Sequence, residues 1–423
     1  MRKILIIAAI VLAFSSCRKA PDYVPYIGEK SQLTYSTYAE QFDVIWNNIN
    51  RGYVFWDVDK TDWDEVYKKY MPEFESFDNR VDAGETIATS ELKELYDNAM
   101  GGLKDHHMSI QVKNLFGDGS DNGVVTVSPG EKEVKKRDYF YKGYIEILEE
   151  IILSIRGLET ENPKYTIVES AIATSEEYDI ILCYMLFELP DGKLIPYLWQ
   201  TGYRISQILQ STEDPESPNY SAAQLINRWL EIACDTDKEK LAGIILDNRC
   251  NTGGAMDDVN FVLSPFVKND FTTLSTRYKE GPGRLEHSVW TPMVIKPKDY
   301  SRDLAAENIP YVVLSNIYSI SMGEITSYHI SKMPTGYMIG ERTFGATGPL
   351  YPTDFISMTY GGSFGNIDTE NHYVYTSTLE VKTIDGIVPE GIGFTPNKEL
   401  LTKEVGVKAQ LDAALDYIIN YNK

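Results

Sequence analysis

The sequence predicts a mixed protein of the α+β or α/β class, with an N-terminal helical domain before a helix-covered β-sheet. From residue 39 to about 105, apolar residues recur at the spacing of amphipathic helices. Beyond residue 180, short apolar segments typical of buried strands alternate with helical segments, which favours helices on both faces of a sheet. The chain of 423 residues is 43% hydrophobic and 24% charged, enough for two or three globular domains.

The first residues have the pattern of a secretory signal. Arg2 and Lys3 precede an apolar run from Ile4 to Phe14, and these eleven residues are too few to span a bilayer, which takes about 20. A basic start, a short apolar run and small residues after it mark a segment that is removed on export. We therefore expect residues 1–16 to be a signal peptide.

Cys17 follows Ser15 and Ser16 directly, an arrangement that resembles the lipobox of bacterial lipoproteins. The resemblance implies acylation of Cys17, which would hold the exported chain on a cell-envelope membrane, in the periplasm or at the surface. The alternative is an ordinary secreted protein in which this cysteine is incidental. Residues 17–38 are polar and carry two prolines, so we expect a linker between the lipid and the fold.

Three helices are expected in the N-terminal domain, residues 39–105. The apolar residues of the first share one face: Phe42, Ile45, Trp46 and Ile49. Asp62 and Glu65 resemble a capping box at the start of the second helix. Ser90 is the expected N-cap of the third helix, which Gly101-Gly102 would end.

Residues 106–180 give the weakest pattern, and we assign them only as an insertion or linking region. Residues 181–423 are expected to form the second domain. Its clearest elements are two apolar strands, at 241–246 and 311–314, each followed by a polar loop and a helix. Further strands are expected at 179–187, 195–199 and 373–381, and helices near 225–233, 322–333 and 411–418.

The charge balance argues against a nucleic-acid partner, because 62 Asp and Glu against 40 Lys and Arg give a net charge of −22. No Cys-x-x-Cys motif or Cys/His cluster occurs, so we expect neither a metal nor a cofactor. Cys183, Cys234 and Cys250 are odd in number, so at least one is expected to be a free thiol unless a bond to another chain forms.

Ser321 is a candidate nucleophile at the start of the helix that follows the strand 311–314. A hydroxyl there lies beside unpaired backbone N–H groups and the positive end of the helix dipole. These groups stabilise an oxyanion when a neighbouring base activates the serine. The alternative is that Ser321 is only a helix N-cap, a position that serine favours.

The strand 241–246 ends in a polar loop that contains Asp247, Arg249, Gly253 and Gly254. Ligands of open α/β sheets bind beyond the carboxyl ends of the strands, so this loop and Ser321 would suit one shared cleft. Glycines would let a substrate backbone approach closely. The alternative is that the loop only builds a turn with a salt bridge.

His107 and Glu390 are the remaining candidates. His106 and His107 are adjacent in the loop after the third helix, and histidine is the usual general base for a serine nucleophile. Adjacent histidines in a polar loop can also be a surface accident. Glu390 is the one carboxylate of a turn-rich segment, residues 389–396, which by itself predicts only a loop.

Together and in order, these segments resemble the tail-specific (C-terminal-processing) serine peptidases, in particular the branch that includes the tricorn core protease. The matching segments are Leu103–His107, Asp247–Gly254, Ser321–Glu324, Gly340-Glu341 and Glu390–Pro396. The resemblance implies a crotonase-like ββα core and a peptide or protein substrate, hydrolysed through an acyl-enzyme.

The resemblance also implies a role for each candidate residue. Ser321 would be the nucleophile, His107 the base and Glu390 part of the polar network that supports the site. The backbone N–H groups of Met322 and of the Gly253-Gly254 loop would form the oxyanion hole.

Departures from the family pattern select the branch and leave alternatives open. Ala346 stands where the Ser–Lys branch has its lysine, which favours the Ser/His branch. Thr252 replaces a common glycine, and His106 stands where that branch commonly has a serine. These changes leave a second hypothesis, a catalytically inactive relative that binds peptides or glycans in the same cleft. A third is a lipid-anchored scaffold protein.

Overall fold

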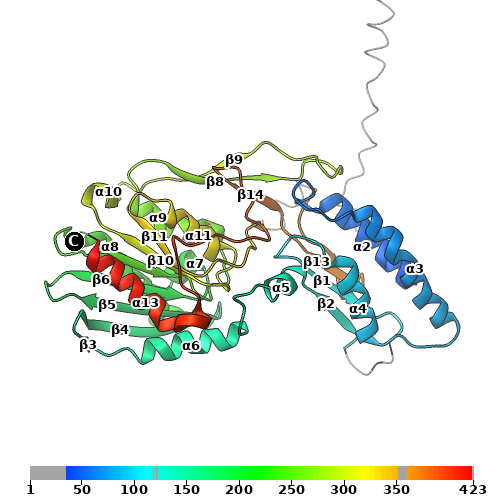
Figure 1. Ribbon diagram of the computed structural model, residues 1–423, viewed down its shortest axis with the longest axis horizontal. Helices are drawn as coiled ribbons and strands as arrows, with labels where there is room; N and C mark the ends of the chain where they lie inside the picture. Colours follow the sequence, from blue (N-terminus) through cyan, green and yellow to red (C-terminus); the bar gives the residue numbers. More distant parts are fainter. Residues whose placement is uncertain (1–34, 118, 120–121, 351–359, 422–423) are drawn as a thin grey trace, which may run out of the picture.

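The structure is a computed structural model that describes residues 35–117, 119, 122–350 and 360–421 (Figure 1). The expected signal peptide and the lipidation candidate Cys17 lie outside the described residues. Within the described part, no helix combines the length and the apolar character needed to cross a membrane. Cys183, Cys234 and Cys250 are all free thiols, which confirms the expectation of at least one.

The N-terminal lobe packs three helices around one apolar core, as the helical periodicity predicts. They are α2 (Tyr38–Gly52), α3 (Trp63–Asp82) and α4 (Thr89–Met100). The Asp62 side chain accepts a hydrogen bond from the Glu65 N–H at 3.1 Å, so the predicted start of the second helix is confirmed. The predicted cap of the third helix is wrong: Ala88 is the N-cap, and Ser90 already lies inside α4.

A four-stranded antiparallel sheet completes this lobe, in the order β12-β13-β1-β2. Its strands are β1 (Ser109–Lys113), β2 (Val124–Val127), β12 (Phe364–Asn366) and β13 (His372–Tyr375). Two of them come from the segment that the sequence left unassigned and two from the C-terminal part of the chain. The lobe therefore extends beyond residue 105, and the chain returns to it after residue 360.

The second lobe is built on a sheet in the order β15-β11-β10-β7-β6-β5-β4-β3. Its strands are β3 (Glu161–Asn162), β4 (Tyr165–Ser175), β5 (Ile180–Glu188), β6 (Leu194–Gln200), β7 (Ile244–Asp247), β10 (Tyr311–Ser315), β11 (Gly336–Gly340) and β15 (Lys398–Glu399). The strands from β6 to β15 pair in parallel, and β3 to β6 pair antiparallel. Because β3 and β4 belong to this sheet, it begins before residue 181.

Helices cover both faces of this sheet, which confirms the predicted mixed architecture (Figure 1). Ile244 and Leu246 of β7 face one core, and Ile245 between them faces the other. Burial on both sides explains why this strand reads as a continuous apolar run. One face is covered by α7 (Ile205–Leu209), α8 (Tyr220–Asp235), α9 (Val259–Leu263) and α11 (Met322–Ser331), and the other by α6 (Tyr144–Arg156) and α13 (Thr402–Asn420).

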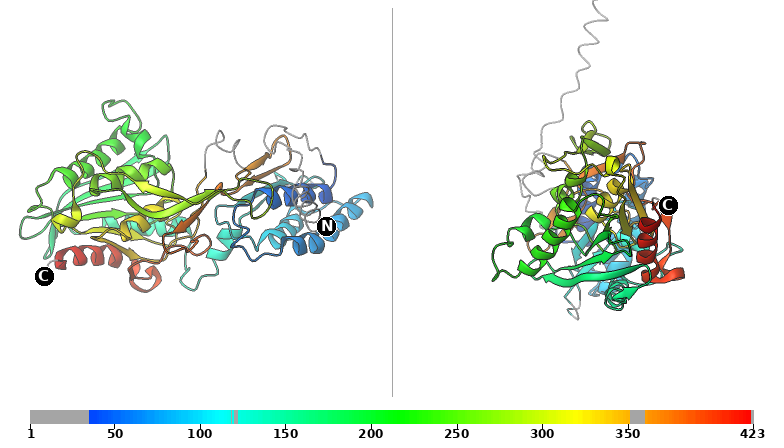
Figure 2. Two further views of the ribbon diagram at one scale, coloured as in Figure 1. Left: turned by 90° about the horizontal axis from the view of Figure 1, so that it is seen from above. Right: turned by 90° about the vertical axis from the view of Figure 1, so that its left-hand side faces the viewer.

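A third sheet, in the order β14-β8-β9, lies between the two lobes (Figures 1 and 2). It consists of β8 (Phe271–Tyr278), β9 (Thr291–Ile295) and β14 (Leu379–Thr383). The single strand expected at 373–381 is therefore wrong: β13 and β14 are separate strands of different sheets. The short helices are α5 (Pro129–Val134), α10 (Leu304–Glu307), and the 3-10 turns η1 (Met256–Asp258) and η2 (Ser264–Phe266).

Asp247 and Arg249 form a buried ion pair at the end of β7, so for these two residues the salt-bridge alternative is correct. The Arg249 Nη2 lies 2.5 Å from the Asp247 Oδ2, and their side chains are 2% and 0% exposed. Arg249 also donates to the Val407 carbonyl and to Gln410, both in the first half of α13. The pair holds the C-terminal helix against the sheet.

Candidate active site

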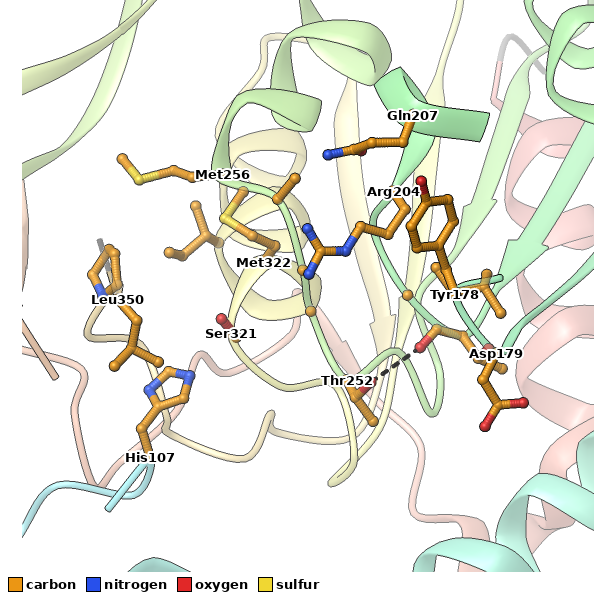
Figure 3. Close-up of a pocket in the computed structure, with 18 of the residues that line it drawn as sticks. His107, Tyr178, Asp179, Arg204, Gln207, Thr252, Met256, Ser321, Met322 and Leu350 are labelled. Atoms are coloured by element: carbon orange, nitrogen blue, oxygen red, sulfur yellow. Dashed lines mark hydrogen bonds between the residues drawn. The ribbon is translucent and has the colours of Figure 1, made fainter. Parts of the chain in front are cut away.

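A cleft with a volume of about 1220 Å³ brings together side chains from both lobes (Figure 3). Ser321 and Met322 lie on its wall at the start of α11, and Gly253 and Gly254 lie beside them after β7. His107 enters from the loop between α4 and β1. Five of the six candidate site residues of the fold thus line one space, and the sixth, Glu390, is buried behind His107.

Ser321 occupies the N-cap position of α11, but its backbone is not that of an ordinary cap. Its φ and ψ are 55° and −119°, whereas an N-cap residue is typically in the β region. A non-glycine residue in such a conformation costs about 1–3 kcal/mol and persists only where its surroundings enforce it. The strain favours the nucleophile interpretation over that of a simple cap.

Buried Glu324 enforces this conformation. Its carboxylate accepts hydrogen bonds from the Ser321 N–H at 3.1 Å, from the Gly345 and Ala346 N–H groups and from the Thr343 hydroxyl. Burial raises the pKa of the Glu324 carboxyl to about 7. The sequence contained this residue in the Ser-x-x-Glu motif, but its role in positioning the serine appears only in the structure.

The glycine loop touches the serine directly. A Cβ on Gly253 would lie 2.5 Å from the Ser321 Cβ and 3.0 Å from the Met322 nitrogen, and the φ of Gly253 is +91°. The Gly253 N–H donates to the Asn251 side chain at 2.9 Å, so it is already engaged. Within the described part of the chain, no acceptor receives the N–H of Met322 or of Gly254, which leaves these two as available donors.

The His107 ring borders the cleft, and its Nδ1 is buried without a hydrogen-bond partner in the described structure. Asp105, His107 and Glu390 each place a side-chain nitrogen or oxygen within 4.8 Å of the others. Burial lowers the pKa of the His107 imidazole, and the Asp105 carboxylate acts in the opposite direction. A buried ring nitrogen without a partner, close to two carboxylates, makes His107 a candidate general base with groups nearby to orient it.

Other donors already hold both carboxylates. Asp105 accepts from the His107 N–H, the Thr376 hydroxyl and both the N–H and hydroxyl of Ser377. Glu390 accepts from the His106 N–H at 2.7 Å and from Thr347 and Gly348. Burial and the neighbouring Asp105 raise the pKa of Glu390 well above its usual range. Carboxylates engaged in this way suit a supporting network better than a metal site, which needs open lone pairs.

His106 faces away from the reaction space. Its Nδ1 lies 3.2 Å from the Phe344 carbonyl and its ring packs edge-on against Phe344. Burial lowers its pKa to about 4. Glu390 thus links the histidine loop, through the His106 N–H, to the segment 343–348, which also carries the donors that hold Glu324.

The described residues that line the cleft include no lysine. The Ala346 carbonyl lies 3.1 Å from the Ser321 N–H, so the position of the family's lysine is next to the serine but carries only a methyl group. Lys332 is at the far end of α11, with its Nζ over the Tyr328 ring at 5.1 Å. Histidine is therefore the base that the geometry offers.

Comparison with known families agrees with this geometry. The family model described as Peptidase family S41 matches residues 220–397, and the model described as Tricorn protease C1 domain matches residues 35–87. No curated protein matches the chain in sequence.

Solved structures share the fold across nearly the whole chain. A crystal structure of a candidate peptidase from Parabacteroides merdae is 18% identical, with a TM-score of 0.59, and the alignment covers 91% of this chain and 97% of that one. Mature CPAF in complex with lactacystin is 13% identical, with a TM-score of 0.55 and coverage of 91% and 99%. At these identities the likeness establishes the fold alone.

Proposed function

Since the chain belongs to peptidase family S41 and so to the serine peptidases, we propose that it cleaves peptide bonds through an acyl-enzyme on Ser321. The observation that carries this proposal is the strained Ser321 in one cleft with His107, whose ring is backed by Asp105 and Glu390. We further propose cleavage of envelope proteins or peptides, with processing near their carboxyl termini, as the family resemblance implies.

His107 would take the proton of the Ser321 hydroxyl as the Oγ attacks the carbonyl carbon of the scissile bond. The N–H groups of Met322 and Gly254 would donate to the resulting oxyanion, with Gly253 as the wall that lets the substrate approach. Asp105 would stabilise the charged imidazolium, and Glu390 would support the histidine loop through the His106 N–H. His107 would then give its proton to the departing amine, and water, activated by the same imidazole, would hydrolyse the ester.

Replacing His107 by alanine should lower kcat by about 10²–10⁴-fold, the usual contribution of a general base. In the wild type the neutral imidazole is the active form, so activity should fall as the pH drops through its pKa. Because burial lowers this pKa from the reference value of 6.5, we expect the acid limb of kcat/KM below pH 6.5. Lys332→Ala is the control and should behave as wild type. Full activity in His107→Ala, or an acid limb well above pH 7, would contradict the assigned base.

Replacing Gly253 by alanine should lower kcat/KM by about 10²-fold, because the new Cβ would force Ser321 to move and a misplacement of about 1 Å costs this much. Gly192→Ala is a matched control, since Gly192 has a similar φ of +81° but a Cβ added there would meet no atom within 4 Å. Steady-state kinetics of both variants make the comparison. Equal activity in the two would mean that the glycine loop does not confine the nucleophile.

The second candidate function, an inactive relative that binds peptides or glycans in the cleft, rests on one observation. No hydrogen bond joins His107 to Ser321 in the described structure. In active enzymes, catalytic hydrogen bonds are often long before substrate binds and tighten only in the substrate complex. Peptide binding without hydrolysis by the wild type would favour this candidate.

For the cellular location, we propose export and attachment to a cell-envelope membrane through acylated Cys17, on the basis of the N-terminal sequence. Mass spectrometry of protein extracted from membranes of the native host should find a mature chain that starts at Cys17 and carries acyl groups there. A chain that retains Met1, or a form without lipid, would contradict this proposal.

A further inference from the structure

Arg204 projects into the cleft from the loop between β6 and α7, on the same side as Met322 and Thr252 (Figure 3). We propose that its guanidinium binds a carboxylate of the substrate, so that the cleft selects peptides with an acidic group near the scissile bond. This inference rests on the proposed peptidase function and adds a specificity determinant to it.

The backbone around Arg204 is fixed relative to the nucleophile. The Tyr203 N–H donates to the Gly253 carbonyl at 2.7 Å, and the Ala255 N–H donates to the Tyr203 carbonyl at 2.8 Å. Gly253 in turn lies against Ser321. Arg204 therefore directly follows Tyr203, which is hydrogen-bonded to the glycine loop that touches Ser321.

Buried Asp258 holds the backbone that follows Arg204. Its carboxylate accepts hydrogen bonds from the backbone N–H groups of Ile205 and Ser206. Because the backbone on both sides of Arg204 is already held in place, binding of a ligand to its side chain would cost little further main-chain entropy.

The Arg204 side chain lacks the ion pair that an acid-rich chain readily provides. Among the described residues no carboxylate lies within 4.0 Å of its nitrogens, although several other arginines are paired: Arg80, Arg228, Arg249, Arg277, Arg284 and Arg302. The cleft also has two exposed acids, Asp179 and Asp257. Figure 3 shows the Asp179 carboxylate directed away from Arg204. The guanidinium is thus left for an incoming anion.

Arginine presents parallel N–H groups that match a carboxylate in a bidentate pair, which makes a carboxylate the anion of choice for a peptide substrate. Two sources supply that group: an Asp or Glu side chain close to the cleaved bond, and the α-carboxylate of a peptide that ends in the cleft. The Arg204 guanidinium would bind either carboxylate in the same way. Synthetic peptides that carry only one of the two groups distinguish these sources.

The test compares internally quenched peptides in which Glu or Gln stands at each of the positions around the cleaved bond, each with a C-terminal acid or amide. We expect about a tenfold higher kcat/KM, mainly through KM, for the peptide whose carboxylate reaches Arg204, as charge-assisted hydrogen bonds at an exposed group allow. Arg204→Gln should remove this preference. Arg51→Gln, a change of an exposed arginine on α2 outside the cleft, should retain it.

A dependence on Glu identifies a side-chain carboxylate as the ligand, and a dependence on the C-terminal acid alone identifies the α-carboxylate. Equal kcat/KM for all peptide pairs, or a preference for the acidic peptide that remains in Arg204→Gln, would overturn the role assigned to Arg204. Hydrolysis of the peptides in that case would still support the proposed peptidase function.

Binding of the same peptides, labelled with a fluorophore, to Ser321→Ala and to Ser321→Ala/Arg204→Gln keeps the two proposals separate. Arg204-dependent binding of the acidic peptides, together with a wild type that never cleaves them, would support the anion site and refute the peptidase. Absence of both binding and cleavage would overturn the anion site as well.

Discussion

Replacement of Ser321 by alanine should reduce peptide hydrolysis by about 10⁴-fold or more, because no other group would accept the acyl chain. The fold should survive, since the contacts that hold this position are made by the backbone N–H of residue 321 with Glu324 and Ala346. Hydrolysis of a peptide library by purified protein is the measurement.

Ser331→Ala is the matched control for this variant. Ser331 ends the same helix, and its hydroxyl only donates to the Tyr328 carbonyl at 2.7 Å. We expect its activity to equal that of the wild type. Residual hydrolysis in Ser321→Ala close to the wild-type rate would show that a different residue is the nucleophile.

Replacement of Arg249 by methionine should lower the free energy of unfolding by about 3–5 kcal/mol, the usual cost of leaving a buried charge without its partner. Asp247 would keep a hydrogen bond from the Tyr197 hydroxyl at 2.8 Å but lose its only ion pair in the described structure. Urea unfolding followed by circular dichroism measures the change.

Lys68→Met is the control for the ion pair, because Lys68 and Glu65 form a pair at 2.6 Å on the exposed surface of α3. Exposed pairs contribute little to stability, so we expect an unchanged unfolding midpoint. A midpoint for Arg249→Met equal to that of the wild type would mean that the buried pair does not hold α13 on the sheet.

The sequence could predict those helices and strands whose buried positions produce a regular spacing of apolar residues. The α2 and α8 faces and the fully apolar strands β7 and β10 have such patterns, because each is buried on a fixed set of positions. Strands β3 and β4 could not be predicted in this way: most side chains of β4 are at least partly exposed, so its pattern does not separate an edge strand from a loop.

Pairings between distant parts of the chain were beyond the sequence pattern as well. Residues 109–112 of β1 pair with residues 372–375 of β13, and no local period reports such a contact. For the same reason 373–381 looked like one strand, although its two halves join different sheets.

The candidate site residues could be proposed from motifs, but their environments could not. The motif around His107 contains Asp105, yet only the fold shows this carboxylate beside Glu390 and held by Thr376 and Ser377. The glycine loop suggested N–H donors, but only the structure shows that the Asn251 side chain, which belongs to the same motif, already accepts the N–H of Gly253. Arg204 carried no sequence signal, because its relevance lies in the absence of a described ion-pair partner.

Labelling with a fluorophosphonate probe, followed by mass spectrometry of the modified peptide, tests the central claim most directly. The probe reacts with a serine only when a base and an oxyanion hole activate it. We predict a single adduct on Ser321 in the wild type, none in Ser321→Ala and at least about 10²-fold slower labelling in His107→Ala. No adduct on the wild-type protein, or an adduct on another serine, would contradict the account.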